Sequence, residues 1–282
     1  MSPRVVIYQI PNHHRSLVIC TAMEEGLRRL SVDVVRKYEN EYSAIEGDIA
    51  VFYGLEGRLR RIFRDYKEKA KAAYVDLGYW KRKEPKARFD GYHKIVINDR
   101  HPTAYFQRRQ HDNSRSRWMD VTIKPWSPGT GHILIAGMGD KAAEAEGYDF
   151  EAWERWAIKK IRMFTNRSIV YRPKPSCKRA RPIAGVGYSA KTVDLSQALR
   201  NCYAVVTHHS NVAVEALCAG VPVWCWKGVA TPFASQDLRT LDSPTMLEGR
   251  EQWVNDIAWC QWSTAEMRSG LAWTQLQEEG LV

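Results

Sequence analysis

Residues 204–224 constrain the fold more than any other part of this sequence. They read AVVTHHSNVAVEALCAGVPVW: an apolar β-branched run, a polar turn, a small apolar helix-like segment, a glycine and a second apolar run. This order predicts a buried strand, a sharp turn, a helix that stops at the glycine, and another buried strand. Two such strands joined through a helix belong in a parallel sheet.

The turn of this segment carries candidate ligand-binding groups. His208, His209, Ser210 and Asn211 lie where the strand ends and the helix begins. Unpaired backbone N–H groups and the positive end of the helix dipole make such a position suitable for a phosphate. Glu215 lies one helical turn further on, on the same side, where its carboxylate could accept hydrogen bonds from sugar hydroxyls. The segment therefore predicts half of a nucleotide-binding pocket, with the two histidines either contacting the ligand or filling the turn.

Strands and helices alternate along most of the remaining sequence. In the first half, strands are expected at residues 4–10, 32–36, 48–54, 73–78 and 93–98, and helices at 16–30 and 58–71. In the second half, strands at 132–139 and 168–175 and helices at 149–164 and 195–201 precede residues 204–224. Alternation of this kind predicts an α/β fold with parallel sheets and helices on both faces.

Composition divides the sequence into two domains and a tail. Residues 124–131 read KPWSPGTG, which is typical of a linker. We expect one domain at 1–124 and a second at 131–249. Residues 250–282 are expected to be helical and to bridge both domains. Four tryptophans of this tail either pack the last helices in place or form a ligand platform, namely Trp253, Trp259, Trp262 and Trp273.

Two further loops follow strands of the second domain. Gly137 and Gly139 allow close approach of a ligand to the backbone, although glycines after a strand also make ordinary turns. Arg172 and Lys174, in the sequence RPKP, place two cations on a backbone stiffened by prolines, which suits a diphosphate or a rigid surface exit. In an open parallel sheet, ligands bind at the carboxyl ends of the strands, so these loops and residues 208–215 reinforce one another.

At this point the sequence resembles a known family. A strand, RPKP and then THHSNVAVEALCAGVPV, within residues 131–227, are similar to the donor-binding domain of glycosyltransferases of the B fold. The resemblance implies two Rossmann-like domains facing across a cleft and a nucleotide-sugar donor, with UDP-sugar expected. It implies that Ser210 and Asn211 hold the diphosphate, that Glu215 contacts the ribose or donor sugar, and that Arg172 neutralises charge on the leaving group. It also implies no obligatory metal, in keeping with the missing Asp-x-Asp pair.

The first domain is then expected to hold the acceptor and, in an inverting reaction, a general base. Such a base must accept a proton from the attacking hydroxyl. Asp76 and Asp99 are acids at otherwise apolar strand ends, and His13 follows the first strand. Each of them could instead be a helix cap or a member of a loop salt bridge, and a retaining enzyme needs no base.

The positive charge of the chain is concentrated in one segment. The net charge is +10, and residues 58–124 hold 19 Lys and Arg against 8 Asp and Glu. Such a segment favours a polyanionic partner or forms a solvated basic surface. Aromatic residues lie between its cations, as in proteins that stack on extruded bases. The candidate nucleic-acid contacts are Arg58, Arg61, Lys81, Arg82, Arg108, Arg109, Arg115 and Arg117.

These features favour transfer of a sugar to hydroxymethylated pyrimidines in DNA, and the broad plan resembles the DNA glucosyltransferases of tailed phages. The alternative is a transferase for surface polysaccharide or lipid-linked sugar, whose basic domain docks on anionic membranes. That alternative predicts an exposed amphipathic helix, which Leu59, Ile62 and Phe63 fit in part, as does core packing. A third interpretation is a non-catalytic nucleic-acid-binding protein on this fold, which would not bind UDP.

Other classes of protein are disfavoured. The sequence has no apolar run long enough for a membrane span, and a strand is expected directly at the N-terminus, where a signal peptide would lie. The six cysteines are scattered without zinc spacing, which predicts reduced core thiols. We therefore expect a cytoplasmic protein, monomeric, in the host cytoplasm if it is phage-encoded.

Overall fold

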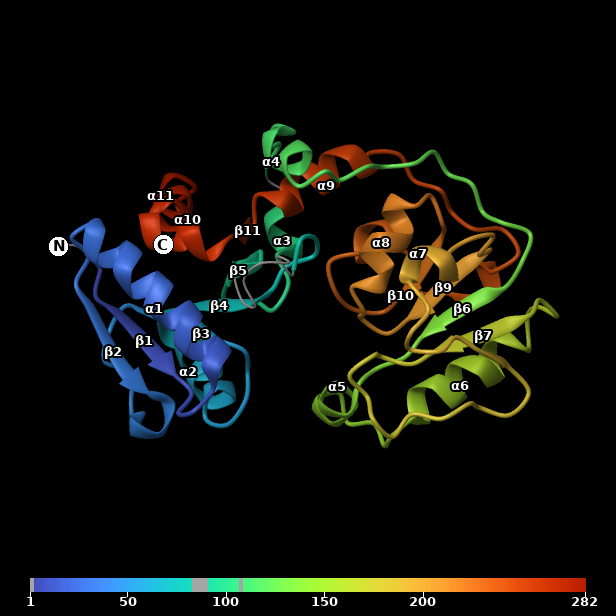
Figure 1. Cartoon of the computed structure of the whole chain (residues 1–282), viewed down its shortest axis with the longest axis horizontal. Coiled ribbons are helices and arrows are strands. Elements are labelled where there is room, and N and C mark those ends of the chain that lie inside the picture. The colour runs from blue at the N-terminus through green and yellow to red at the C-terminus, as the bar shows by residue number, and fades with distance from the viewer. Residues whose placement is uncertain (1–2, 83–90, 107–108) are drawn as a thin grey trace. The chain divides into compact units, whose positions relative to one another are not determined.

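The computed structural model describes residues 3–82, 91–106 and 109–282. The chain forms two compact units, which Figure 1 shows with their elements labelled. Unit 1 consists of Met1–Met119 and Asn255–Val282, and unit 2 is Asp120–Val254. The last residues of the chain therefore belong to the same unit as the first, and the change from unit 2 to unit 1 occurs within helix α9 (Arg250–Ala258).

Unit 1 is built on a six-stranded sheet with the order β11-β5-β4-β3-β1-β2. Four neighbouring strands of this sheet pair parallel to one another. Along the chain, each of these strands is connected to the next through a segment that contains a helix, as parallel pairing requires. These strands are β1 (Val5–Gln9), β2 (Val34–Tyr38), β3 (Ile49–Tyr53) and β4 (Lys71–Leu77).

Helices cover both faces of this sheet. The alternation of side chains along β1 sends Val5 and Ile7 into one core with α1 (His14–Arg29), and Val6 and Tyr8 into another with α2 (Leu59–Lys69). A Cβ on Gly26 would lie 1.9 Å from the backbone oxygen of Met267, so α1 and α10 (Thr264–Ser269) pack in close contact. The remaining helices of unit 1 are η1 (Glu39–Glu41), α3 (Thr103–Phe106), α4 (Ser114–Trp118), α10 (Thr264–Ser269) and α11 (Leu271–Glu278).

The expectation of parallel strands fails for the edge of this sheet. Strand β5 (His93–Ile97) runs antiparallel to β4, and β11 (Gln261–Trp262) runs antiparallel to β5. The ends of the connection from β4 to β5 are tied together, since the N–H of Gly78 donates to the oxygen of Tyr92 and the N–H of Tyr92 to that of Lys81, both at 2.9 Å. This pairing returns the chain directly beside β4.

Unit 2 contains a five-stranded sheet with the order β10-β9-β6-β7-β8, and all of its pairings are parallel. The expected strand–turn–helix–strand of residues 204–224 is β9 (Ala204–Thr207), α8 (Val212–Cys218) and β10 (Val223–Cys225). The other elements are β6 (Ile133–Ala136), α5 (Asp140–Ala145), α6 (Ala152–Ile161), β7 (Ile169–Arg172), β8 (Gly187–Tyr188), α7 (Leu195–Ala198), η2 (Thr231–Phe233) and η3 (Leu238–Thr240).

The Pro/Gly-rich segment 124–131 is bound to the body of unit 2. The N–H of Ser127 donates to the oxygen of Gly220 at 2.9 Å, and the Arg250 guanidinium lies 3.7 Å from the centre of the Trp126 ring. Gly220 has a φ of +79°, and a Cβ there would lie 2.1 Å from the oxygen of Pro125. The glycine that stops α8 is thus required both by its backbone conformation and by the segment packed against it.

The six cysteines are all free and buried, as the sequence predicts. Burial raises the pKa of Cys20 to about 11 and those of Cys202, Cys218 and Cys225 to about 12, so these thiols stay protonated near neutral pH. Among residues 3–82, 91–106 and 109–282, no helix combines the length and the apolar character that crossing a bilayer requires.

Candidate functional site

The carboxyl ends of three strands lie side by side in unit 2. In the register of the sheet, Ala136 at the end of β6 pairs with Arg172 at the end of β7 and with Thr207 at the end of β9. Thr207 in turn pairs with Cys225 at the end of β10. The structure therefore brings the loops at 137–139, 173–175 and 208–211 to one edge of one sheet, as the sequence pattern indicates.

The loop after β6 is a tight glycine turn organised by a buried acid. The N–H of Met138 donates to Oε1 of Glu154 at 2.7 Å. A Cβ on Gly137 would lie 2.9 Å from that same oxygen and 2.8 Å from the ring of Tyr171, so a side chain does not fit there. Burial raises the pKa of Glu154. The carboxyl group of Glu154 thus holds the turn that carries Gly137 and Gly139.

Lys174 lies against the second glycine of this turn. A Cβ on Gly139 would be 2.9 Å from Cδ of Lys174 and 3.7 Å from its Nζ. The lysine itself is exposed to solvent. The methylene stem of Lys174 therefore crosses Gly139 and places an ammonium group beside the backbone at the start of α5. The loops after β6 and β7 thus combine a glycine backbone with an exposed cation, which suits a phosphate.

Arg172 occupies a different environment from Lys174. Its guanidinium is buried and donates to Oγ of Ser189 at 3.0 Å and to the oxygen of Val193 at 2.8 Å. These contacts hold the loop 189–193 against β7. The Arg172 guanidinium therefore joins the end of β7 to the loop at 189–193.

The turn after β9 is held by hydroxyl groups. Oγ1 of Thr207 donates to the oxygen of Ala136 at 2.9 Å and accepts the N–H of Ser210 at 3.3 Å. Oγ of Ser210 accepts the N–H of Val212 at 3.2 Å. Asn211 and Glu215 are half-buried, and Asn211 precedes α8 without a side-chain capping bond. Ser210 thus uses its hydroxyl oxygen for the first turn of α8, while Asn211 stands at the helix start as predicted.

An aromatic cluster, which the sequence pattern did not single out, surrounds His208. This residue is buried, its Nδ1 lies 2.7 Å from Nδ1 of His209, and the rings of Tyr148 and Trp153 are 5.7 and 5.9 Å away. Trp226, the residue after β10, contacts Trp153 at 5.9 Å. The position of Trp226 at a strand end is the one sequence signal that would have placed it at this edge.

The predicted acids of unit 1 lie near its antiparallel edge. Asp76 accepts the hydroxyl of Tyr74 at 2.7 Å and the N–H of Leu77 at 2.8 Å, and it is paired in register with Lys94 of β5. Lys94 is 3% exposed, and burial lowers its pKa. Nζ of Lys94 lies 3.4 Å from Nδ1 of His101. Sequence reasoning singled out Asp76 but missed this buried lysine, because a single Lys in a strand gives no periodic signal.

The other two base candidates have local structural partners. Oδ1 of Asp99 accepts the N–H of Arg100 at 2.6 Å in the loop after β5. Nδ1 of His13 accepts the N–H of Ser16 at 3.1 Å and caps α1. In the neutral imidazole of His13 the hydrogen is therefore on Nε2, which donates rather than accepts.

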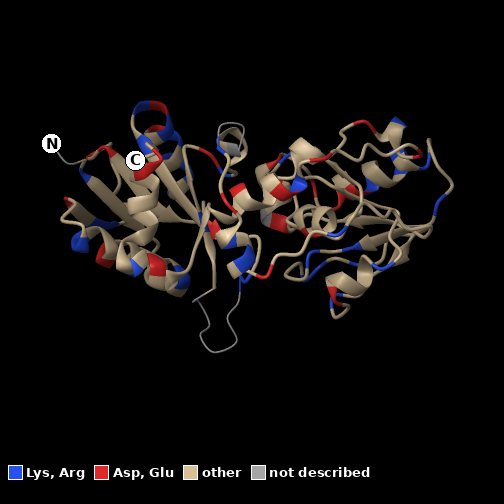
Figure 2. Cartoon of the chain, turned by 90° about the horizontal axis from the view of Figure 1, so that it is seen from above, with Lys and Arg blue, Asp and Glu red and all other residues tan. Residues whose placement is uncertain are grey.

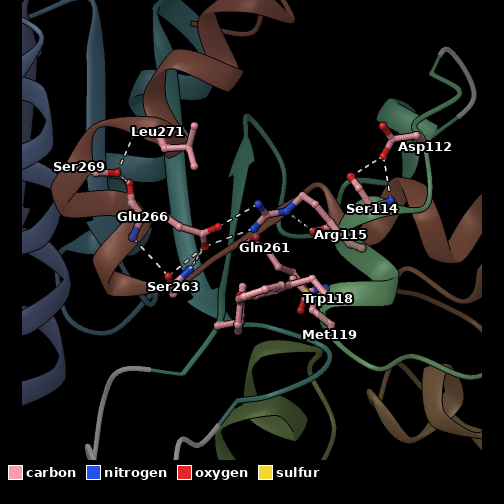
Figure 3. A network of polar contacts seen from close by, with 12 residues as sticks. Asp112, Ser114, Arg115, Trp118, Met119, Gln261, Ser263, Glu266, Ser269 and Leu271 are labelled. Atoms are coloured by element: carbon pink, nitrogen blue, oxygen red, sulfur yellow. Dashed lines mark hydrogen bonds and ion pairs between the residues drawn. The ribbon is translucent and has the colours of Figure 1, made fainter.

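Arg115, one of the candidate nucleic-acid contacts, is engaged within unit 1. Figure 3 shows its guanidinium reaching from α4 to β11 and α10. NH1 donates to Oε1 of Glu266 at 2.9 Å, NH2 donates to the oxygen of Gln261, and the group lies 4.0 Å from the centre of the Trp262 ring. The Arg115 side chain is 11% exposed. This arginine joins three segments of unit 1 and presents little charge to a partner.

Several other cations of the basic segment are also engaged within the protein. Arg58 donates to the oxygen of Asn40 at 2.7 Å, Arg61 lies 3.4 Å from Asp65, and Lys81 donates to the oxygen of Trp118 at 3.0 Å. Figure 2 shows Lys and Arg along both units with Asp and Glu among them.

Three of the remaining candidate cations lie in the described part of the chain. Arg109 donates to the oxygen of Glu279, Arg82 is half-buried, and Arg117 is exposed. Arg108 lies outside the described residues. Among the residues that are described, no three His, Cys, Asp or Glu side chains are grouped to hold a metal ion.

Comparison with known proteins identifies the fold. No protein-family model matches the sequence, and no curated protein matches it either. Among solved structures, the chain is similar to a beta Kdo 2,4 transferase, KpsC of Thermosulfurimonas dismutans, with a TM-score of 0.56 and 12% identity over 89% of each chain. It is also similar to the beta Kdo 2,7 transferase of that organism, with a TM-score of 0.58 and 12% identity over 96% of this chain and 99% of the other. The fold is therefore that of two Rossmann-like domains of the glycosyltransferase B type.

Proposed function

We propose that this chain is a glycosyltransferase that takes a sugar from a nucleoside-diphosphate sugar, with unit 2 binding the donor. The observation that carries the proposal is the common edge of β6, β7 and β9, where the stem of Lys174 crosses Gly139. Ligands of open parallel sheets bind at this edge. The similar solved structures are both named as transferases of a sugar, which supports the same assignment.

In this proposal, the diphosphate binds the backbone at Gly139 together with the ammonium of Lys174. A lysine on a flexible stem can follow the phosphate as its charge grows while the bond to the sugar breaks. Asn211, in the loop at 208–211, contacts the diphosphate. Glu215 accepts hydrogen bonds from hydroxyls of the ribose or of the donor sugar. UDP-sugar remains the expected donor, and the chemistry assigned to these residues requires no metal.

Asp76 is proposed as the general base if the reaction inverts the sugar. The hydroxyl of Tyr74 and the N–H of Leu77 fix the orientation of its carboxylate, which leaves further lone pairs to accept a proton from an acceptor hydroxyl. Lys94, its neighbour across the strand pair, is a cation that would stabilise the carboxylate before transfer.

The first proposed acceptor is a hydroxymethyl pyrimidine in DNA. The basic excess in residues 58–124 supports it, although contacts within unit 1 hold Arg58, Arg109 and Arg115. The exposed Arg117 and the ring of Trp118, which is 73% exposed, offer one surface for a nucleic acid, and the exposed Arg60, Arg61 and Arg64 of α2 offer another.

The second candidate acceptor is a sugar hydroxyl of a surface polysaccharide or lipid-linked glycan. The two similar structures carry names of Kdo transferases, which supports it. The amphipathic helix that membrane docking would use is not available on α2, since Leu59 and Ile62 are fully buried in the core and Phe63 packs on Phe52 and Tyr74. A glycan acceptor therefore does not depend on docking through this helix.

The donor assignment is tested by titrating UDP against the protein and following the thermal midpoint and calorimetric heat. Lys174→Ala is expected to weaken UDP binding about tenfold, as loss of one phosphate contact of roughly 1.4 kcal/mol predicts. Lys178→Ala is the matched control, because Lys178 is an exposed lysine four residues away. Equal UDP binding by wild type and Lys174→Ala, or no binding of any nucleoside diphosphate, contradicts the assignment.

The acceptor is identified by supplying a panel of nucleotide sugars with either hydroxymethyl-containing DNA or oligosaccharides. Nucleoside mass spectrometry detects an added sugar on the modified base, and glycan mass spectrometry detects it on the oligosaccharide. Asp76→Asn is expected to retain UDP binding and to lose transfer to whichever acceptor is used. Binding of UDP with transfer to neither acceptor would favour a non-catalytic protein on this fold.

A further inference from the structure

One outer face of helix α6 in unit 2 carries large apolar side chains in contact with solvent. Trp156 is 42% exposed, and Met163, in the turn that continues the helix, is 62% exposed. The N–H of Met163 donates to the oxygen of Lys160 at 3.0 Å, so a helix-like turn extends to this residue. Residues seven apart on a helix lie on one face, two turns from each other. Single exposed apolar residues are ordinary on a protein surface, whereas a pair on one helix face is a candidate interaction site.

Two lysines lie between these apolar side chains on the same face. Lys159 and Lys160 follow Trp156 by three and four residues, which is the spacing of neighbours on a helix surface. Within the part of the chain that the structure describes, the side chains of both lysines form no ion pair or hydrogen bond. The acid of α6, Glu154, is 2% exposed and accepts the N–H of Met138. The outer face of α6 therefore presents positive charge that no acid of this helix balances.

The core of unit 2 fixes the orientation of this face. Trp153, Ala157 and Ile161, on the other side of α6, are at most 1% exposed and pack in the core with strands of the sheet. Figure 1 shows α6 lying along one face of that sheet. The ring of Trp156 also contacts the ring of Trp226 edge to face at 5.7 Å. Because turning α6 to bury Trp156 would expose three core side chains, the apolar and cationic groups stay directed to solvent.

We propose that this face of α6 docks on an anionic lipid bilayer. The ammonium groups of Lys159 and Lys160 then lie among the lipid phosphates, and the side chains of Trp156 and Met163 enter the boundary between headgroups and acyl chains. Tryptophan prefers that boundary, and each lysine near an anionic membrane surface strengthens binding. A nucleic acid fits this face less well, because the thioether of Met163 neither pairs with a phosphate nor offers a ring on which a base stacks.

Lipid docking goes beyond the proposed sugar transfer and uses none of the residues assigned to the donor or to the acceptor. The apolar residues of α2 are buried in the core of unit 1, whereas those of α6 are exposed together with cations. Docking through α6 would hold unit 2 at a bilayer surface, where the acceptor of a lipid-linked glycan lies.

The test is flotation of the full chain with vesicles of phosphatidylcholine alone or with about 40% phosphatidylglycerol. The protein is expected to float with the anionic vesicles and to remain unbound with the neutral ones. Binding should fall steeply between about 0.05 and 0.5 M salt, because salt screens the lysine charges. Duplex DNA retention and UDP calorimetry are measured on the same preparations.

Charge variants locate the docking face. Lys159→Gln and Lys160→Gln are each expected to weaken binding to anionic vesicles about fivefold, and more when combined. The matched control combines Lys67→Gln and Lys69→Gln, which remove the same charge from exposed lysines of α2. This control should change vesicle binding by less than about twofold.

Apolar variants separate a bilayer from other polyanions. Met163→Ser should weaken vesicle binding about fivefold and leave DNA retention unchanged, since it removes an apolar group and no charge. Met246→Ser, at another exposed methionine of unit 2, should alter neither. Trp156→Ser should weaken vesicle binding as well, and Met163→Ser keeps the test decisive if loss of the contact with Trp226 unfolds that variant.

Three results overturn lipid docking: no binding to anionic vesicles, equal binding to neutral ones, or equal effects of the α6 and α2 charge variants. DNA retention that requires Lys159 and Lys160, without vesicle binding, overturns it too and assigns the face to a nucleic acid. Absent vesicle binding with normal UDP binding leaves the donor assignment standing. Vesicle binding without UDP binding contradicts the donor assignment and supports lipid docking.

Discussion

Replacing Arg115 with alanine removes a side chain that joins α4, β11 and α10 of unit 1. The guanidinium donates to Glu266 and to the backbone oxygens of Gln261 and Ala258, and it stacks on Trp262 at 4.0 Å. The sequence pattern placed this residue among the nucleic-acid contacts. Its environment instead predicts that the substitution lowers stability and leaves nucleic-acid affinity nearly unchanged.

The size of the effect follows from these contacts. Breaking a buried ion pair by removing one partner costs about 3–5 kcal/mol. The side chains of Arg115 and Glu266 are 11% and 21% exposed, so solvent relieves part of this cost. Glu266 also keeps two donors, because its Oε2 accepts the N–H and the hydroxyl of Ser263 at 2.7 and 2.9 Å. We therefore expect a loss of about 3 kcal/mol, or a midpoint lower by roughly 6–12 °C for the transition of unit 1.

Urea titration of far-UV circular dichroism measures the loss, and hydrogen exchange of the amides in β11 and α10 locates it. Arg117→Ala is the matched control, since Arg117 is exposed and lies two residues away on the same helix. Arg117→Ala should keep full stability and reduce the salt dependence of DNA retention. Arg115→Ala should lower stability and leave that salt dependence nearly unchanged. A loss below about 1 kcal/mol for Arg115→Ala, or an equal loss for both variants, would refute this reasoning.

Three further substitutions test the fold and the site. Thr207→Val removes the hydroxyl that joins Ala136 to the turn at 208–211. It should lower the free energy of unfolding by about 1–2 kcal/mol and weaken UDP binding in calorimetry. Gly26→Ala places a methyl group 1.9 Å from the oxygen of Met267 and should destabilise unit 1 by more than about 3 kcal/mol in urea titration. Lys94→Met should raise stability at pH 7. Because burial lowers the pKa of Lys94, the unfolded wild-type chain binds more protons than the folded one, so wild-type stability rises with pH. The difference in stability between Lys94→Met and wild type should therefore shrink as the pH rises toward 10.

Each of these has a control. Thr207→Ser keeps the hydroxyl and should restore UDP affinity. Lys67→Met removes an exposed lysine on α2 and should show no gain at pH 7. Gly147→Ala changes a glycine with no atom within 4 Å of the added Cβ, so its smaller loss would report only the backbone strain of a φ of +75°. Wild-type stability in Gly26→Ala would contradict the close packing of α1 on α10.

Unit 2 could be predicted from the sequence because its signals are local and repeated. Strands β6, β7 and β9 are each followed by a glycine, a proline or a polar turn. Parallel pairing then places the carboxyl ends of these strands together. The direction of single side chains could not be predicted. Arg172 and Lys174 are two residues apart in one motif, yet the first is buried against Ser189 and the second is exposed over Gly139.

Unit 1 was harder to predict because its edge depends on contacts distant in sequence. Strand β11 has only two residues and exists because it pairs with β5, more than 160 positions earlier. The same applies to Arg115, whose charge reads as a surface feature until β11 and α10 are placed beside it. Charge composition predicts how many cations a segment holds, but not which of them are satisfied internally.

The division of unit 1 into two pieces of sequence has a consequence for synthesis on the ribosome. Residues 1–119 emerge before unit 2, with β5 paired to β4 but lacking β11 and with α1 lacking α10, whereas unit 2 is contiguous and can fold as soon as it is made. Strand β5 lacks β11 until residues 255–282 leave the exit tunnel. A nascent chain that stalls within unit 2 should therefore be the form most prone to aggregation and most dependent on chaperones.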